Sequence, residues 1–336
     1  MTKRNLLFGC IVAIVAAVVA MVAVNSFQSH LAEPAPAPAQ QPPSGSPRIS
    51  TTTSPSQAPS PPAHGAYFGA WVGPDVFTQA NEIKAVDTLQ QQIGRNLNVV
   101  HTYLKWQAPF PTASDTAFIA QGSTLLISWA GTDTAEITSG GDDAWIRTRA
   151  AQIKALGKPV FLEWRWEMDR PNLRSQVRSG ANFVAAWDHI RAIFTTVGVR
   201  NAAWVWCPTG EGFNNGRAAA FYPGDDEVDW ICVDAYPYGS NVSFASTVDP
   251  FLTWASNHDK PVMIGEYGVP ESDSGEQRAQ WLQAMAKVVQ ADQQIKALLY
   301  FDADSPGQIA YALQGSALSA FRLIARQPYF NPAGAR

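Results

Sequence analysis

Residues 159–167, Pro159-Val-Phe-Leu-Glu-Trp-Arg-Trp-Glu167, decide the fold class of this chain. The segment is a short apolar run that ends on charged and aromatic side chains. Nearly continuous apolar runs of this length are typical of strands that are buried on both faces of a parallel sheet. Seven similar runs recur along the chain, at residues 66–72, 98–106, 124–130, 202–207, 228–236, 261–268 and 297–302.

Helical patterns, with apolar residues spaced by three and four, lie between these runs. The clearest covers residues 275–292, where Ser274 and Gln277 form a plausible capping box at the start. The alternation of eight strands with eight helical segments predicts an α/β fold, a (β/α)8 barrel. A doubly wound sheet is the alternative, but no GxGxxG turn follows the first strand. The other predicted helices cover residues 80–93, 142–156, 180–197, 247–257 and 316–326, with weaker patterns at 115–121 and 216–222.

The N-terminal part of the chain has a different character. In residues 1–30, Lys3 and Arg4 precede about twenty apolar residues. Such a run is long enough to span a bilayer, so we expect a signal anchor, with a cleaved signal peptide as the alternative. Residues 31–63 are rich in Pro, Ser and Thr and predict an extended linker. Residues 64–336 would then form the barrel, on the outer side of the cytoplasmic membrane.

The composition excludes several classes of protein. A net charge of −4 with no basic stretch disfavours a nucleic-acid partner. Three cysteines in 336 residues exclude a disulfide framework, and the absence of CxxC and HExxH motifs gives no signature of a metal site. We therefore expect no metal and no organic cofactor. Cys207 and Cys232 fall on adjacent predicted strands, but parallel strands rarely suit a disulfide, so we do not expect them to be bonded.

Aromatic side chains lie near the ends of almost all the predicted strands. The carboxyl ends of the strands form the active-site face of such barrels, and aromatic faces stack well on sugar rings. These side chains predict a sugar-binding cleft, although a ring of core aromatics is the alternative for each of them. The candidates are Trp71, Trp106, Trp129, Trp166, Trp206, Tyr236 and Tyr267.

Two carboxylates also fall at strand ends, Glu167 on the fourth strand and Glu266 on the seventh. Alternation predicts that Glu163, Arg165 and Glu167 share one face of the fourth strand. Arg165 would then pair with either Glu266 or Glu163. Cleavage of a glycosidic bond needs two carboxyl groups, one as a proton donor and one as a nucleophile or base, so Glu167 and Glu266 are the candidate catalytic pair.

The domain resembles glycoside hydrolase family 26. The resemblance rests on residues 166–169 (WEMD), 222–230 (YPGDDEVDW), 234–236 (DAY) and 265–268 (GEYG). It implies a retaining glycosidase in which Glu167 is the acid/base, Glu266 the nucleophile and Tyr236 a hydrogen-bond partner of the nucleophile. The commonest activity in the family is endo-β-1,4-mannanase; mixed-linkage glucanases and β-1,3-xylanases also belong to it.

One residue departs from the pattern of the family. Trp166 stands where the family usually has a histidine that contacts the substrate near the cleavage point. A tryptophan cannot make the same hydrogen bonds, so the recognition of the central sugar is expected to differ. The sequence therefore predicts a membrane-anchored, extracytoplasmic retaining hydrolase of a β-linked polysaccharide. The alternative is a non-catalytic glycan-binding protein of the cell envelope, built on the same barrel.

Overall fold

The computed structural model describes residues 57–239, 242–304 and 309–332. Eight parallel strands pair in chain order and close into a barrel, which confirms the predicted (β/α)8 class. All eight predicted strands are present, each within a few residues of its expected bounds. They are β1 (Tyr67–Val72), β2 (Val99–Leu104), β3 (Thr124–Trp129), β4 (Val160–Trp164), β5 (Ala202–Trp206), β6 (Trp230–Ala235), β7 (Val262–Tyr267) and β8 (Ile295–Asp302).

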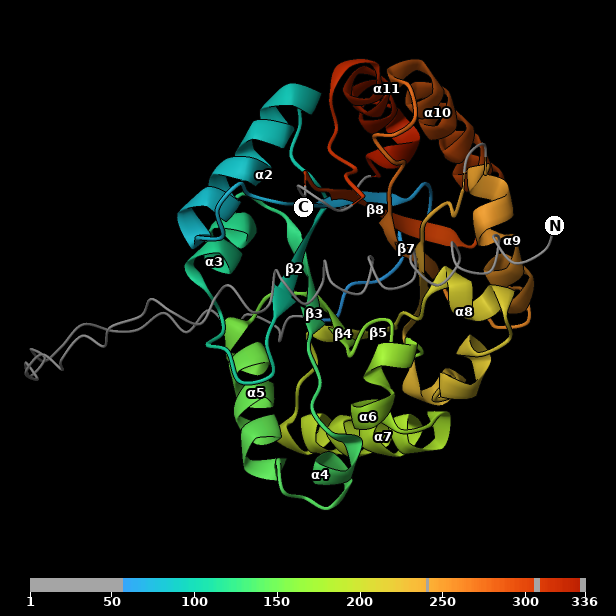
Figure 1. The fold of residues 1–336 in the computed structure, drawn as a ribbon. Helices are drawn as coiled ribbons and strands as arrows, with labels where there is room; N and C mark the ends of the chain where they lie inside the picture. Colours follow the sequence, from blue (N-terminus) through green and yellow to red (C-terminus); the bar gives the residue numbers. More distant parts are fainter. Residues whose placement is uncertain (1–56, 240–241, 305–308, 333–336) are drawn as a thin grey trace, which may run out of the picture.

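Helices surround the barrel as an outer layer (Figure 1). The main helices are α2 (Gln79–Ile93), α3 (Ala113–Ala120), α5 (Asp143–Leu156), α7 (Gly180–Val197), α9 (Phe244–Ala255), α10 (Gly275–Ala291) and α11 (Gly315–Ala325). Shorter turns of helix lie in the connections at the C-terminal ends of the strands. These are α4 (Thr134–Thr138), η2 (Pro171–Leu173), α6 (Arg174–Val177), α8 (Gly210–Asn214), η3 (Ala218–Phe221) and η4 (Asp225–Glu227), with η5 (Pro328–Phe330) at the end of the described chain.

Local sequence signals explain where several helices begin and end. The predicted capping box of α10 is formed, since the Ser274 side chain accepts from the N–H of Gln277 and the Gln277 side chain accepts from the N–H of Ser274. Helix α7 ends at Gly198, which adopts the left-handed conformation that glycine tolerates best. The weak helical pattern at 216–222 corresponds to η3, a short 3-10 turn at Ala218–Phe221.

The barrel has two apolar cores, because successive side chains of a strand point to opposite sides. The inner core fills the N-terminal half of the barrel and includes Val99, Phe161 and Trp230. The outer core lies between the strands and the helices and is much larger. Residues one position apart on a strand therefore belong to different cores, and this parity decides which strand-end residues can reach the mouth of the barrel.

Two irregularities in the strands shape that mouth. Strand β4 ends at Trp164, earlier than predicted, and Arg165 and Glu167 both have positive φ angles of 56° and 51°. The register between β7 and β8 shifts between Ile264 and Tyr267. The chain therefore leaves regular alternation just where the two candidate glutamates lie.

The predictions for residues 1–30 and for most of the linker, residues 31–56, lie outside the described residues. Within the ranges that the structure describes, no helix combines the length and the apolar character needed to cross a membrane.

Candidate active site

Glu167 and Glu266 meet at the C-terminal mouth of the barrel, as the sequence predicted for the two strand ends. One carboxylate oxygen from each of Glu167, Asp234 and Glu266 lies within 4.8 Å of the other two. All three residues are buried, with exposed fractions of 3%, 3% and 6%. The site therefore places three carboxyl groups in a small volume with little contact with water.

Glu167 is held by the tight turn that follows β4. Its backbone N–H donates to the carbonyl of Cys207 at 2.8 Å, and the N–H of Arg170 donates to the Glu167 carbonyl at 3.0 Å. This turn brings the Arg170 guanidinium into contact with one oxygen of the Glu167 carboxyl group, with which it forms an ion pair when that group is ionised. Asp169 fixes the turn to β5, because it accepts from the N–H and the hydroxyl of Thr209 at 2.9 and 2.6 Å. The orientation of Glu167 is thus fixed from both sides.

Glu266 is held by two tyrosines. The hydroxyls of Tyr103, from β2, and Tyr236, which follows β6, each donate to one of its oxygens, the second at 2.8 Å. The adjacent Gly265 has no room for a side chain, since a Cβ there would lie 2.6 Å from the Cys232 sulfur. The hydrogen bond from Tyr236 is the contact that the family resemblance implied.

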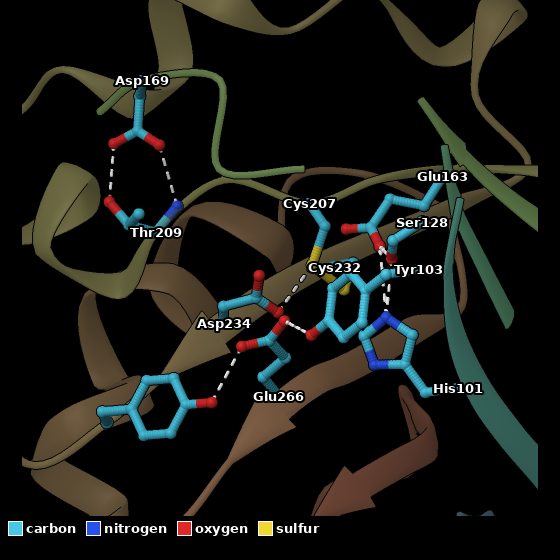
Figure 2. Close-up of a disulfide and its surroundings, with 11 residues drawn as sticks. His101, Tyr103, Ser128, Glu163, Asp169, Cys207, Thr209, Cys232, Asp234 and Glu266 are labelled. Atoms are coloured by element: carbon cyan, nitrogen blue, oxygen red, sulfur yellow. Dashed lines mark hydrogen bonds and ion pairs between the residues drawn. A yellow bond between two sulfur atoms is a disulfide. The ribbon is translucent and has the colours of Figure 1, made fainter. Parts of the chain in front are cut away.

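Cys207 and Cys232 form a disulfide between β5 and β6, so the prediction of unbonded cysteines was wrong. The Cα atoms are only 4.3 Å apart, and both side chains point into the barrel from neighbouring strands. Figure 2 shows the bond beside Asp234, whose carboxylate lies 3.3 Å from the Cys207 sulfur. A disulfide sulfur carries no hydrogen, so this is a packing contact rather than a hydrogen bond.

A second polar group lies deeper in the barrel. His101, on β2, contacts the Ser128 hydroxyl at 2.6 Å, and that hydroxyl donates to Glu163 on β4 (Figure 2). Burial lowers the pKa of His101 to about 3, so the imidazole is neutral. Burial also raises the pKa of Glu163 well above its usual value, and the nearby Glu266 and Glu167 raise it further. His101 is therefore a neutral core histidine, buried and in contact with Ser128.

The electrostatics of the two candidate catalytic groups differ. Burial raises the pKa of Glu167 to about 8, with a further increase from Glu266 and an opposing effect of Arg170. Burial also raises the pKa of Glu266, but hydrogen bonds from Tyr103 and Tyr236 and the Arg170 charge oppose the shift by stabilising the ionised form. Glu167 is therefore protonated near neutral pH, while Glu266 has three groups that favour its carboxylate.

Arg165 does not support either glutamate, so both predicted partners were wrong. Its guanidinium donates to the carbonyl of Gly131 at 3.0 Å and to the side chain of Gln176. The positive φ at Arg165 breaks the alternation that placed it on the face of Glu163 and Glu167. Arg170 is the cation that pairs with Glu167 instead.

The predicted aromatic residues separate into two groups. Trp71, Trp166 and Tyr236 lie at the mouth and are partly exposed. Trp71 stacks on Phe301 with ring centroids 4.4 Å apart, and Trp166 packs against Tyr103 at 5.2 Å. Trp71, Tyr103 and Trp166 also line a cavity of about 110 Å³ between the mouth and α2. Phe301, an aromatic residue of β8, therefore takes part in the mouth.

The other predicted aromatics pack in the outer core. Trp129, Trp206 and Tyr267 have no exposed surface and point toward the helices, so their assignment to the cleft was wrong. Trp206, for example, packs against Trp254 of α9 at 5.2 Å. Trp106 stacks on Trp129 at 4.3 Å, away from the mouth. The error arises because successive side chains of a strand point alternately inward and outward, and these residues occupy outward positions.

Sequence reasoning missed Tyr103 and Arg170. Tyr103 lies within an ordinary apolar strand, so nothing singled it out. Its position two residues after His101 did indicate that both side chains point to the same side of the strand. Arg170 follows Glu167 by three residues, but only the turn after β4 brings them together. Three carboxylates at this spacing could also ligate a cation, but Glu167 is already paired with Arg170, and Glu266 with two hydroxyls.

Two carboxyl groups at the C-terminal mouth of a (β/α)8 barrel are an arrangement that glycoside hydrolases use. Solved structures of such enzymes share the fold of this chain. A family 26 β-mannanase from Bacteroides ovatus matches with a TM-score of 0.59 at 18% identity, over 80% of this chain and 90% of that one. The catalytic domain of an endo-β-1,4-mannanase from Bacillus sp. JAMB-750 matches with a TM-score of 0.61 at 14% identity, over 81% and 89%.

Curated glycosidases are similar in sequence to part of the chain. Endoglucanase H from Acetivibrio thermocellus is 31% identical over 238 residues, which cover 65% of this chain and 25% of that protein. A β-1,3-xylanase from Alcaligenes sp is 28% identical over 137 residues, 39% of this chain and 27% of that protein. The chain thus spans about a quarter of the length of the curated relatives that it matches. No protein-family model matches the chain. The comparisons confirm the resemblance to glycoside hydrolase family 26, whose fold this chain has.

Proposed function

We propose that the protein is a glycoside hydrolase that cleaves a β-linked polysaccharide with retention of anomeric configuration. The observation that carries the proposal is the short approach of two buried carboxyl groups, with oxygens of Glu167 and Glu266 within 4.8 Å. Retaining enzymes have carboxyl groups about 5–5.5 Å apart, whereas inverting enzymes need about 6.5–9.5 Å to admit a water molecule. The relatives named above are themselves glycosidases, which supports the same class.

In the first step Glu266 attacks the anomeric carbon and forms a covalent glycosyl-enzyme. Tyr103 and Tyr236 keep the attacking carboxylate in one orientation. Glu167 gives its proton to the oxygen of the leaving sugar, a role that its raised pKa favours. Arg170 pairs with one oxygen of Glu167, Oε1, which leaves Oε2 for the proton.

In the second step Glu167, now ionised, takes a proton from a water molecule. The resulting hydroxide attacks the same carbon from the side of the departed sugar, and Glu266 leaves as a carboxylate. Arg170 stabilises the Glu167 carboxylate in this interval, since the two groups are in contact. The two displacements together retain the configuration of the anomeric carbon.

For the substrate we propose a β-mannan first, with endo action, because the structural neighbours are described as mannanases. The curated relatives are described as an endoglucanase and β-1,3-xylanases, so β-glucans and β-1,3-xylans are the next candidates. Trp166, in place of the usual histidine, argues against identical recognition of the central sugar.

A hydrolysis screen tests this proposal. The purified chain should release oligosaccharides from one of mannan, β-glucan, β-1,3-xylan or arabinan, and Glu266→Ala should abolish the release. The released sugars should keep the β configuration in early NMR spectra. Binding to a glycan that neither the wild type nor the variant cleaves would instead favour a non-catalytic glycan-binding protein. An α-configured first product would rule out retention.

We propose further that residues 1–30 anchor the enzyme on the outer side of the cytoplasmic membrane, with residues 31–63 as the spacer. The support is the sequence alone, Lys3 and Arg4 ahead of an apolar run. Cell fractionation should find the full-length chain in the membrane pellet. Recovery of the whole population from the culture medium, cut near residue 30, would indicate a cleaved signal peptide.

A further inference from the structure

Tyr311, a residue that the sequence analysis did not single out, packs against a tyrosine of the candidate active site. It lies in the connection between β8 and α11. Its ring lies beside the ring of Tyr236, with the two centroids 4.9 Å apart. The hydroxyl of Tyr236 donates to Glu266 at 2.8 Å. Tyr311 therefore borders one of the two residues that hold the proposed nucleophile, although no step of the proposed mechanism uses it.

The backbone of Tyr311 is fixed by hydrogen bonds at both of its polar groups. Its N–H donates to the carbonyl of Ala303 at 2.8 Å. Its carbonyl accepts from the Tyr300 hydroxyl at 2.7 Å and from Nη2 of Arg278 at 3.2 Å. Both donors belong to buried residues. These contacts leave the chain at Tyr311 little freedom to carry its ring away from Tyr236.

Arg278 connects this part of the chain to the segment that follows β7. It lies near the start of α10 and is buried. Besides the Tyr311 carbonyl, its guanidinium donates to the carbonyls of Val269 at 3.3 Å and Ala312 at 2.7 Å. The donors of arginine lie in one rigid plane, so a single side chain can hold two segments in a fixed relation. Arg278 thus ties the chain after the GEYG motif to Tyr311.

Gly268, the last residue of the GEYG motif, makes room for the Tyr311 ring. A Cβ at Gly268 would lie 2.8 Å from Cδ1 and 2.9 Å from Cγ of that ring. Gly268 does not adopt a left-handed conformation, so its backbone does not require a glycine. The close approach of the Tyr311 ring is what favours glycine here. The proposed mechanism gives Glu266 a role in this motif but gives none to Gly268.

We propose that Tyr311, held by Arg278, is a positioning residue for Glu266. Its ring keeps Tyr236 in the orientation in which the Tyr236 hydroxyl donates to the Glu266 carboxylate. The ring makes this contact, so the Tyr311 hydroxyl is dispensable for it. That Glu266 is a nucleophile rests on the proposed function; the effect of Tyr311 on Glu266 does not.

The protonation of Glu266 reports this hydrogen bond without any turnover. Burial raises the pKa of Glu266. Hydrogen bonds from Tyr103 and Tyr236 and the charge of Arg170 oppose that rise. A weaker hydrogen bond from Tyr236 should therefore raise the pKa of Glu266 further. The other titratable groups that face Glu266 are Glu163, Glu167, Asp234 and Tyr311.

A carbon-13 NMR titration of the purified full-length chain, labelled in its glutamate carboxyl groups, measures this pKa. The spectrum of Glu266→Gln assigns the Glu266 signal by its absence. Tyr311→Leu should raise the pKa of Glu266 by about one unit, because a hydrogen bond to a charged group changes an equilibrium by about tenfold or more. Tyr311→Phe keeps the ring and should match the wild type.

Tyr329→Leu is the matched control. Tyr329 is also partly exposed and also packs on an aromatic residue, Phe330, with centroids 5.2 Å apart. Its carbonyl accepts from the N–H of Ala66, which precedes β1, so Tyr329 lies at the N-terminal end of the barrel, opposite the mouth. Its variant should leave the pKa of Glu266 unchanged.

Two further variants test the route of the effect. Tyr236→Phe removes the hydroxyl and should raise the pKa by itself, and Tyr311→Leu should then add nothing in that background. Arg278→Met should raise the pKa by less than Tyr311→Leu, because Tyr300 and Ala303 still hold the Tyr311 backbone. On a substrate that the enzyme cleaves, Tyr311→Leu should lower kcat by about tenfold and change KM by less than about twofold.

Three results would overturn the inference: an unchanged pKa of Glu266 in Tyr311→Leu, an equal rise in Tyr329→Leu, or additive rises in the variant that combines Tyr311→Leu with Tyr236→Phe. An unchanged pKa in folded Arg278→Met would overturn the part assigned to Arg278. The outcome separates from that of the proposed function. Hydrolysis of a glycan, with the pKa of Glu266 unchanged in Tyr311→Leu, refutes only the positioning role. A pKa that Tyr311→Leu raises, without hydrolysis of any glycan, refutes only the glycosidase.

Discussion

The barrel contains two regions that differ sharply in chemistry, although they share the same strands. The upper interior of the barrel is polar, with His101, Ser128, Glu163, Asp234 and Glu266 all buried. The outer core, on the other side of the strands, is apolar and contains several buried tryptophans. Burying charged or polar groups is costly unless they are paired or functional, so the polar region is where a function is expected.

The difference teaches how to interpret an aromatic residue at a strand end. Trp71 and Trp206 both lie in the last two positions of a strand, yet Trp71 points into the mouth and Trp206 toward α9. Only the parity of each position separates them. Residue type alone identified the ring of aromatics but could not divide it between the two regions.

The largest effect should follow from removing a catalytic carboxyl group in the polar region. We expect Glu167→Ala to lower kcat on natural glycans by about 10²–10⁴-fold, the usual contribution of general acid–base catalysis. Glycosides with good leaving groups should still form the intermediate. Glu266→Ala should lose turnover altogether, and azide should restore it with inverted product. Steady-state kinetics with Asp259→Asn, an exposed carboxylate, as the control measures both.

The next largest effect should come from the outer core, on stability rather than catalysis. Trp206→Ala should lower the free energy of unfolding by about 3–5 kcal/mol, because it leaves a cavity beside Trp254. Trp71→Ala, at the mouth, should mainly raise KM, with a smaller loss of stability. Denaturant titration together with KM for both variants measures the contrast. A raised KM in Trp206→Ala at a temperature where it is fully folded would contradict the assignment to the outer core.

The disulfide should stabilise the polar region. Replacing both Cys207 and Cys232 by Ala should lower the free energy of unfolding by about 3 kcal/mol, the typical contribution of a bond that closes a loop of this length. We also expect a lower kcat, since the Cys207 carbonyl holds the backbone of Glu167 and the sulfurs pack against Gly265. The measurements are thermal unfolding and kcat. An unchanged kcat in the folded double variant would mean that the bond does not position the glutamates.

The pH dependence of activity should report the protonation of Glu167. Its pKa is raised to about 8, and the first step needs the protonated form. The specificity constant kcat/KM should therefore fall as the pH rises through about 8, by about tenfold for each further pH unit. Aryl glycosides with good leaving groups need less protonation, so their alkaline decline should be weaker. The pH profiles of kcat/KM for the two substrate types test this directly.

The smallest effect is expected for Glu163. Burial raises its folded pKa well above the usual value, so the folded state favours the neutral form, which resembles a glutamine. The raised pKa favours the folded state below the unfolded pKa of about 4.3, and this stabilisation is lost as the pH rises toward the folded pKa. Glu163→Gln should match the wild type in stability below about pH 4, where the wild-type side chain is neutral in both states, and should lose less stability than the wild type as the pH rises. A steeper loss in the variant, in thermal unfolding across pH, would contradict a neutral Glu163.

The sequence was sufficient for the barrel and for the two glutamates because both signals are local. Each strand is a short apolar run, and Glu167 and Glu266 follow such runs directly. Contacts that depend on an irregular backbone could not be predicted. Arg170 replaces Arg165 as the cation of the site because the chain after β4 turns with positive φ at Arg165 and Glu167.

The disulfide could not be predicted for a related reason. General geometry disfavours a bond between adjacent parallel strands, but Cys207 and Cys232 both point inward and their Cα atoms lie only 4.3 Å apart. Parity also decided the errors at Trp129, Trp206 and Tyr267, which alternate with inward positions. To assign a site at the strand ends of a barrel, it is therefore necessary to know which side chains point inward as well as which residue types are present.

The most direct test of the central claim is to locate the covalent intermediate. A 2-deoxy-2-fluoro glycoside with a good leaving group, chosen from the sugar that the hydrolysis screen identifies, should trap the glycosyl-enzyme. Peptide mass spectrometry should then find the sugar on the peptide that contains Glu266, and the label should persist in Glu167→Ala. A label on Glu167, or on any residue other than Glu266, would contradict the proposed mechanism.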